Sequence, residues 1–205
     1  SAQSGRHRVV LVEYGEEALQ IRLHLIRAAR EYIDLQNFIL RKDDSGMLIL
    51  SELLEAARRG VQVRLLLDQM FSFSDAEYLV ALTMAHRNFE IRFYNPSFYK
   101  ADMAKHDWIS AVACCFRRFN QRMHNKTFLV DESIGMTGGR NYQDAYFDHA
   151  QGMNYKDRDI LIIGPVVAQM QASFQEYWDF EHAVSLDQLT DVGRLKKKGK
   201  FKIWG

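Results

Sequence analysis

The amino-acid sequence predicts a single α/β domain with helices on both faces of a mostly parallel or mixed sheet. The chain has 205 residues, of which 47% are hydrophobic and 26% are charged, as is usual for one globular domain with one core. Along its first half, apolar runs of strand length alternate with segments of helical period. Parallel strands need crossover helices between them, so this alternation favours a largely parallel sheet.

The elements of this first half follow from local patterns. The expected ranges are strand 9–12, helix 15–30, strand 32–40, helix 47–59, strand 61–67, helix 75–86 and strand 89–94. Leu19, Leu23 and Ile26 lie on one face of the first helix. Gly60 ends the second helix, because glycine is favoured just past a helix C-terminus. The strand over 61–67 is apolar enough to be central, and Pro96 follows the last strand.

Residues 97–122 break the alternation and mix aromatic with basic side chains. The aromatic members are Phe98, Tyr99, Trp108, Phe116 and Phe119, and the basic members are Lys100, Lys105, Arg117, Arg118 and Arg122. Such a mixture suits a lipid headgroup surface, where rings enter the interface and cations stay with phosphates. The alternative is a helical insertion packed on the sheet with its basic side in solvent. The sequence leaves both interpretations open.

The charge of the chain is balanced overall but uneven along it. With 27 Lys+Arg and 26 Asp+Glu the net charge is +1, so no global field favours nucleic acid. Residues 194–202 carry six basic and no acidic side chains, which leaves the rest of the chain at −5. We expect an N-terminal extension over 1–8, the folded domain over 9–187 and a basic tail or linker over 188–205.

Composition also limits the cellular setting. No apolar run approaches the roughly 20 residues of a membrane-spanning helix. Cys114 and Cys115 are adjacent, and a disulfide between neighbours is strained. We therefore expect two reduced thiols that fill apolar space, in a reducing compartment.

The segment 123–131 is a predicted strand that carries the chemistry, and a second short strand follows over 132–137. Alternate residues of a strand share a face, so His124 and Lys126 point the same way. An imidazole beside a fixed ammonium suits attack on a phosphodiester, because the cation neutralises the phosphoryl oxygens. Asp131 lies seven positions after His124 and faces away, which favours a role in the turn between the two strands.

Gly138 and Gly139 end the second strand, and Asn141 follows. Glycine lets backbone amides approach an anion, and the Asn141 amide adds a neutral donor. These residues predict a metal-free phosphate clamp. No cluster of carboxylates or of Cys and His has metal-ligand spacing, so we expect neither a metal nor another cofactor.

These motifs resemble a known family. His124, Lys126 and Asp131, followed by Gly138 and Gly139, match the HxKxxxxD(x6)GG signature of the phospholipase D superfamily. The longer strings at 122–128, 138–141 and 144–148 look most like the bacterial cardiolipin synthase branch, and within it the C-type synthases. The likeness implies a phospholipase D-like fold. It covers the N-terminal half of such an enzyme, because those proteins usually carry two signatures and this chain has one.

The resemblance also implies roles for the residues. One signature histidine attacks the phosphodiester to form phosphohistidine, and the histidine of a second signature protonates the leaving alcohol. We assign His124 as the nucleophile, count Lys126 and Asp131 as catalytic signature residues, and expect Lys126, Gly138, Gly139 and Asn141 to bind the phosphate. A carboxylate from a later strand holds the histidine's other ring nitrogen in the family. Asp157 and Asp159 share that strand face; alternation does not choose between them, and the motif alignment favours Asp157.

Three functions follow as hypotheses. The first is a phosphatidyltransferase of cardiolipin-synthase type, peripheral on the cytoplasmic side of the bacterial cytoplasmic membrane, whose partners are phospholipid and a second HxKxxxxD half. The second is a homodimeric phosphodiesterase or nuclease, because single-signature members of the superfamily include small dimeric nucleases. The acidic body speaks against nucleic acid as a partner. The third is a non-catalytic half that binds phosphate or lipid.

Overall fold

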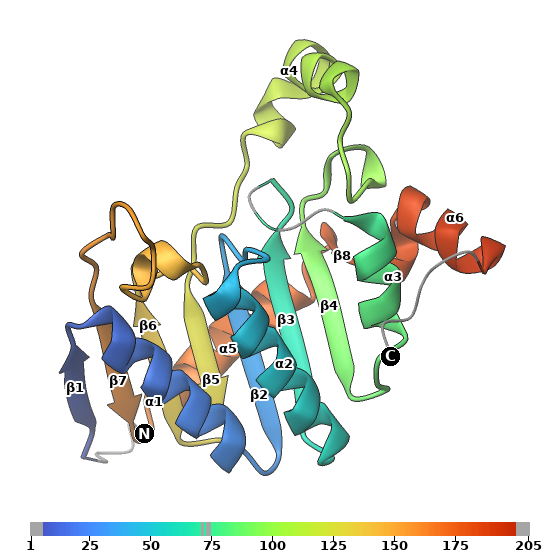
Figure 1. Ribbon diagram of the computed structural model, residues 1–205. Helices are drawn as coiled ribbons and strands as arrows, with labels where there is room; N and C mark the ends of the chain where they lie inside the picture. Colours follow the sequence, from blue (N-terminus) through green and yellow to red (C-terminus); the bar gives the residue numbers. More distant parts are fainter. Residues whose placement is uncertain (1–5, 71, 73–74, 200–205) are drawn as a thin grey trace.

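One open, mixed sheet forms the centre of the protein (Figure 1). The structure is a computed structural model that describes residues 6–70, 72 and 75–199. The strands within these residues follow the spatial order β1-β7-β6-β5-β2-β3-β4-β8. Their bounds are β1 Arg8–Val12, β2 Tyr32–Asn37, β3 Gln62–Asp68, β4 Phe89–Tyr94, β5 Thr127–Val130, β6 Ile134–Gly138, β7 Asp159–Ile163 and β8 Ala183–Ser185.

The predicted fold class is confirmed, but the parallel part of the sheet is confined to β2, β3 and β4. All other neighbouring strands are antiparallel. Simple alternation would suggest that β1 pairs with β2. Instead β1 forms the edge of the sheet beside β7. β5 and β6 are joined by a tight turn, which places them antiparallel without a crossover helix. β5 then pairs with β2 and fills the centre of the sheet.

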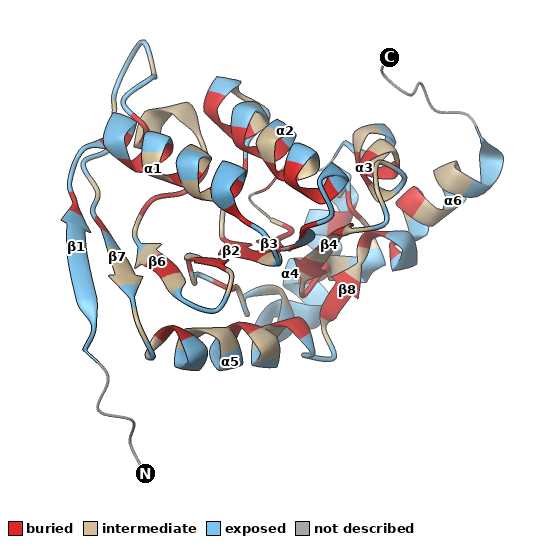
Figure 2. Ribbon diagram, turned by 90° about the horizontal axis from the view of Figure 1, so that it is seen from below, coloured by how far each residue is buried: buried red, intermediate tan, exposed pale blue. Residues whose placement is uncertain are grey.

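Helices cover both faces of the sheet, as expected. Figure 2 shows α1 (Gly15–Ala28), α2 (Asp44–Arg58) and α3 (Ala76–Thr83) on one side and α5 (Val167–Trp178) on the other. Asp43 and Asp75 begin α2 and α3, because each side chain accepts a hydrogen bond from a backbone amide of the first turn, Gly46 and Tyr78 respectively. The short 3₁₀ turns are η1 (Ser97–Tyr99), η2 (Asp144–Tyr146) and η3 (Leu186–Gln188).

The alternation of β3 divides the core between these two faces. Val63, Leu65 and Leu67 belong to the cluster under α1–α3, whereas Leu66 belongs to the cluster under α5. Phe174 and Trp178, which are well buried, anchor α5 on the sheet. The strand is apolar on both faces because each face carries its own helical layer.

Residues 97–122 form η1 and then α4 (Lys105–Phe119), which stands beyond the end of the sheet rather than on a face of it (Figure 1). The interpretation as an insertion packed on the sheet is therefore wrong. Cys114 and Cys115 are exposed and paired in a vicinal disulfide, which corrects the expectation of buried reduced thiols. The backbone at Cys115 departs from helical angles, so α4 is kinked there.

Part of the segment expected to be a tail or linker is helical. Residues Thr190–Lys198 form α6, with Val192 buried in the core cluster that also contains residues of α3. Lys200 and Lys202 of the predicted basic stretch, and residues 1–5 of the predicted N-terminal extension, lie outside the described residues. None of the helices within the described residues is long and apolar enough to cross a membrane.

Candidate active site

His124 and Lys126 lie at the edge of the sheet where the parallel strands end. β5 runs antiparallel to β2, so Thr127 at the start of β5 pairs with Gln36 near the end of β2. His124 and Lys126 immediately precede Thr127, in the connection that descends from α4 (Figure 1). The regular strand is thus shorter than the predicted 123–131. The carboxyl ends of parallel strands are where α/β sheets place their ligand sites.

The two signature side chains are in contact. The Lys126 ammonium donates to Nε2 of His124 at 3.3 Å and to the His124 carbonyl oxygen at 3.1 Å. The Phe38 ring packs edge-on against the imidazole, with centroids 4.8 Å apart, and lies 5.6 Å from the Lys126 nitrogen. His124 is exposed, whereas Lys126 is only 8% exposed. A solvent-facing imidazole and a largely buried ammonium therefore share one small site.

Burial and charge act on Lys126 in opposite directions. Desolvation lowers the pKa of its ammonium below the usual value, and the carboxylates of Asp157 and Asp159 partly oppose that shift. Both carboxylates therefore favour the charged form of Lys126. Burial deprives the Lys126 ammonium of part of its hydration. A bound phosphate would stabilise the ammonium in place of the missing water.

A buried carboxylate fixes the chain just before His124. Asp68, at the end of β3, accepts from the Met123 amide at 3.0 Å and from the Arg122 guanidinium at 3.2 Å. Burial raises the pKa of Asp68, while Arg122 and the backbone amides oppose the shift. The sequence-based predictions gave Asp68 no role, although an aspartate at the end of a central apolar strand is a signal for one. Asp68 sets the backbone from which His124 projects.

Asn141 is held with its amide nitrogen available. Its Oδ1 accepts from the Ile39 amide at 3.2 Å, and Ile39 adjoins Phe38, which touches His124. Asn37, at the end of β2, donates to the Arg140 carbonyl at 3.3 Å and so ties the two segments together. No described residue accepts a hydrogen bond from Nδ2 of Asn141. The segment after β2 thus links Asn141 to the signature pair.

Gly138 and Gly139 lie directly against a neighbouring segment of the chain. The Gly139 amide donates to the Arg158 carbonyl at 3.1 Å, so it is already used and does not point to an anion. A Cβ at Gly139 would overlap the Asp157 carboxylate, and one at Gly138 would overlap Asp159. Glycine is required here because two carboxylates of the neighbouring segment lie directly against the backbone. In this structure the Gly139 amide is thus engaged by a backbone carbonyl, and phosphate binding by Gly138 and Gly139 stays a prediction.

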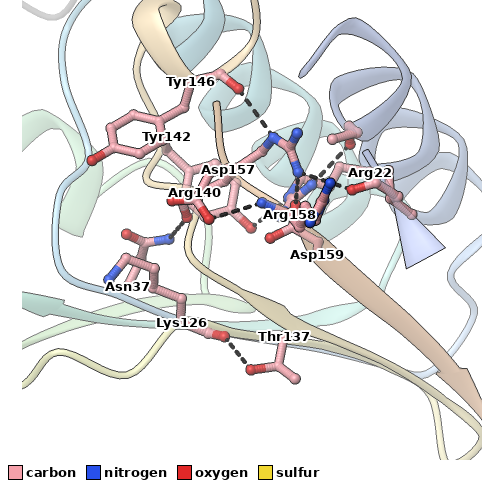
Figure 3. A network of polar contacts seen from close by, with 12 residues as sticks. Arg22, Asn37, Lys126, Thr137, Arg140, Tyr142, Tyr146, Asp157, Arg158 and Asp159 are labelled. Atoms are coloured by element: carbon pink, nitrogen blue, oxygen red, sulfur yellow. Dashed lines mark hydrogen bonds and ion pairs between the residues drawn. The ribbon is translucent and has the colours of Figure 1, made fainter. Parts of the chain in front are cut away.

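Asp157 and Asp159 take different positions. Asp157 is partly exposed and accepts from the Arg158 amide at 2.8 Å, and no described carboxylate is hydrogen-bonded to the His124 ring. Asp159 is buried and pairs with Arg22 at 2.9 Å and with Arg140 at 3.2 Å (Figure 3). The structure thus does not bring Asp157 to the imidazole as a hydrogen-bond partner. Its carboxylate acts on Lys126 instead.

Arg22 and Arg140 are buried residues that have no role in the sequence-based predictions. Besides Asp159, Arg140 donates to backbone carbonyls of Val12, Glu13 and Tyr146. Arg22 donates to the hydroxyl of Tyr142 at 3.3 Å. Arg22 stands among Ala18, Leu19 and Ile26 on the buried side of α1, and an arginine on an apolar stripe is the signal that could have found it.

Asp131 lies at the other end of β5 from His124. Its carboxylate accepts from the amides of Arg30, Glu31 and Tyr32 at 2.9–3.4 Å, where the chain enters β2. Its own backbone is left-handed, with φ 50°, in the turn between β5 and β6. The structure therefore places Asp131 as an organiser of turns, away from the signature pair. Within the described part of the chain, no group of three or more His, Cys, Asp and Glu could hold a metal ion.

Solved structures share this fold. Phosphatidylserine synthase from Haemophilus influenzae superposes with a TM-score of 0.67 at 15% identity, over 92% of this chain and 42% of that one. NucT from Helicobacter pylori superposes with a TM-score of 0.61 at 15% identity, over 89% of this chain and 99% of that one. Nuc from Salmonella typhimurium, a phospholipase D family member, gives 0.56 at 16% identity, over 89% and 98%.

Sequence comparison is more specific. Cardiolipin synthase C from Escherichia coli is 35% identical over 192 residues, which are 94% of this chain and 39% of that protein. An uncharacterised protein from Helicobacter pylori is 37% identical over 191 residues, or 93% and 37%. The chain thus spans about two fifths of the length of these relatives. Residues 23–178 match the family model described as cardiolipin synthase, phospholipase D-like domain. The chain belongs to this phospholipase D-like family of cardiolipin synthases.

Proposed function

We propose that this chain forms one half of a two-histidine site that transfers a phosphatidyl group through a phosphohistidine at His124. The observation that carries the proposal is the contact of 3.3 Å between the Lys126 ammonium and Nε2 of the exposed His124. In the resting site this hydrogen bond engages the ring lone pair. A phosphodiester that draws the ammonium onto its own oxygens would release the lone pair for attack.

The chemistry follows from that exchange. Lys126 and the Nδ2 group of Asn141 bind the non-bridging oxygens, so negative charge on phosphorus is neutralised as His124 attacks. A bond forms between Nε2 and phosphorus, and the bond between phosphorus and the leaving oxygen breaks. An acceptor alcohol then attacks the phosphohistidine, and the imidazole leaves with its electron pair restored. The product is a new phosphodiester, and no redox change occurs.

The leaving oxygen needs a proton that this site does not supply. Among the residues that the structure describes, no second imidazole adjoins the His124–Lys126 pair. We therefore assign the acid, and later the base, to a second HxKxxxxD half, supplied by another domain or by a second copy of the chain. Phospholipid is the proposed substrate, and the cytoplasmic face of the bacterial membrane is the proposed location, because a cardiolipin synthase is among the relatives.

A phosphodiester with a good leaving group separates the role of His124 from that of the missing acid. We expect the chain alone to release up to one equivalent of 4-nitrophenolate from phosphatidyl-4-nitrophenol in a burst, because this leaving group needs no protonation. His124→Ala abolishes the burst. His24→Ala, which changes an exposed histidine on α1, leaves it unchanged. A burst that persists in His124→Ala, or that vanishes equally in His24→Ala, would contradict the assignment.

The second candidate is a phosphodiesterase that acts on nucleic acid as a homodimer. It is favoured by the superposition on NucT and Nuc, which this chain covers over 99% and 98% of their solved chains. The same His124 would attack, and the partner copy would supply the acid. Plasmid cleavage that depends on His124, without turnover of the phosphatidyl ester, would establish this function in place of lipid transfer.

A further inference from the structure

An apolar stripe runs along α4 and faces solvent. Ile109 and Val112 have the spacing of one helical face, Phe116 follows the kink at Cys115, and the exposed fractions of the three are 71%, 49% and 57%. Trp108 at the border of the stripe is 37% exposed. Large apolar side chains at such spacing normally face a core, yet none of these does. Their grouping on one helix distinguishes them from scattered surface apolar residues.

The rest of the described chain does not cover this stripe. α4 stands beyond the end of the sheet (Figure 1), and its inner side, with Ala111 and Phe119, rests on η1. Between α4 and η1 remains a largely apolar cavity of about 240 Å³, lined in part by Phe98 and Tyr99. The two rings are 40% and 42% exposed. The apolar surface thus continues from the helix to the loop beneath it.

Cations flank the stripe at both ends. Lys105 lies in the first turn of α4 and Arg117 in the last, and neither has an ion-pair partner among the described residues. The only carboxylate on the helix, Asp107, is buried and bound by Lys100 at 2.7 Å. The exposed side of α4 therefore presents apolar groups and positive charge without a compensating carboxylate of its own.

The cations at both ends of the stripe help to decide whether a second copy of the chain or a lipid surface covers α4. A second copy of α4 would bring cations against cations in either orientation, because both ends of the helix are basic. An anionic lipid surface complements the cations and takes up the apolar side chains. We infer that α4 is an interfacial helix that lies on anionic phospholipid, with Ile109, Val112 and Phe116 in the boundary between headgroups and acyl chains.

The proposed lipid contact at α4 can be related to the site of phosphatidyl transfer. The choice of phospholipid as the ligand rests on that proposed function. The chain passes directly from the end of α4 at Phe119 to His124, and both lie at the same end of the sheet (Figure 1). The interfacial helix and the signature pair would therefore lie at the same end of the domain.

Flotation with liposomes tests the inference. We expect the chain to float with vesicles of phosphatidylglycerol and phosphatidylcholine and to float much less with phosphatidylcholine alone. Phe116→Asp or Ile109→Asp lowers binding at least tenfold, whereas Met153→Asp, at an exposed apolar residue outside α4, does not. Lys105→Glu and Arg117→Glu each lower binding about fivefold or more on anionic vesicles. Arg87→Glu, also at an exposed position, is the control for charge.

The outcomes separate this inference from the proposed function. Absence of flotation, or equal flotation of the Phe116→Asp and Met153→Asp variants, overturns the interfacial role of α4. So does a Phe116→Asp variant that keeps flotation and loses a dimer in sedimentation, because the stripe would then join two copies. The nitrophenolate burst with a short-chain, fully soluble phosphatidyl ester reports on His124 alone. Flotation without a burst would overturn the function and leave the lipid contact standing.

Discussion

The buried ion-pair cluster around Asp159 leads to a sharp prediction about stability. Its carboxylate lies between two guanidinium groups, 2.9 Å from Arg22 and 3.2 Å from Arg140, and the exposed fractions of the three side chains are 1%, 5% and 1%. Asp159→Asn keeps the shape but leaves two cations buried without a countercharge. Removal of one partner from a buried ion pair costs about 3–5 kcal/mol. The loss is comparable with much of the roughly 5–15 kcal/mol stability of a typical domain.

Two further variants grade this effect. Arg22→Met leaves a balanced pair of Asp159 and Arg140, so we expect a smaller loss than in Asp159→Asn. Glu55→Gln makes the same chemical change at the exposed pair with Arg58, where both side chains are 55% exposed. An exposed pair contributes about 0–1 kcal/mol. The expected order of destabilisation is therefore Asp159→Asn, then Arg22→Met, then Glu55→Gln.

Urea denaturation followed by circular dichroism measures this order. A loss of about 3 kcal/mol lowers the midpoint by about 1 M or more, given the usual urea dependence of small proteins. The reasoning is refuted if Asp159→Asn is as mild as Glu55→Gln. It is also refuted if Arg22→Met is the more damaging of the two buried variants, because charge balance would then not govern the cluster.

Three other predictions concern the site and its supports. Asp131→Ala removes the acceptor for the amides of residues 30–32 and should lower the free energy of unfolding by about 1–3 kcal/mol, measured by urea denaturation. Asp131→Asn keeps an oxygen acceptor and tolerates the left-handed backbone, so its loss should be smaller. Equal losses in the two variants would refute the role of Asp131 as an acceptor for these amides. Gly139→Ala should displace the Asp157 carboxylate and destabilise the fold, whereas Gly152→Ala, where a Cβ meets nothing within 4 Å, should be nearly neutral in the same assay. Only protonated Lys126 attracts phosphate, so anion binding should be lost as pH rises through its lowered pKa, below 10.5. Asp157→Asn removes a carboxylate that raises this pKa and should move the loss, measured by phosphate titration calorimetry, to lower pH; an unchanged alkaline limb would contradict the coupling.

The sequence predicted the elements of the parallel core because their signals are local. The apolar strand Gln62–Asp68 and the capped helix Asp44–Arg58 lie close to their expected bounds. The partner of β1 was not predictable by alternation, because strand order depends on which edges remain when β5 and β6 pair. Phe174 and Trp178 on α5 are buried, whereas Phe180, just beyond the end of α5, is 40% exposed, a difference that the apolar character of all three residues does not reveal.

The site divides in the same way. The pairing of His124 with Lys126 follows from two residues of one short segment, and the structure brings them together. The difference between Asp157 and Asp159 could not be read from alternation, because both have the same parity in the strand. It depends on Arg22, which is 137 positions away in the chain. Long-range polar partners of this kind leave only weak traces in a single sequence.

The ends of the segment that carries α4 are fastened to one another. The Asn95 side chain donates to the carbonyls of Arg118 and Gln121, and Arg122 donates to the Asn95 carbonyl at 2.9 Å. The segment thus begins and ends at one cluster of hydrogen bonds around Asn95. Asp68 adds a further hydrogen bond to this cluster, from Arg122. Movement or replacement of α4 therefore need not change the position of the His124 imidazole. The sheet with its signature pair and the segment with α4 can therefore vary independently. A shorter or unrelated segment could replace α4 between Asn95 and Arg122 without a change in the sheet.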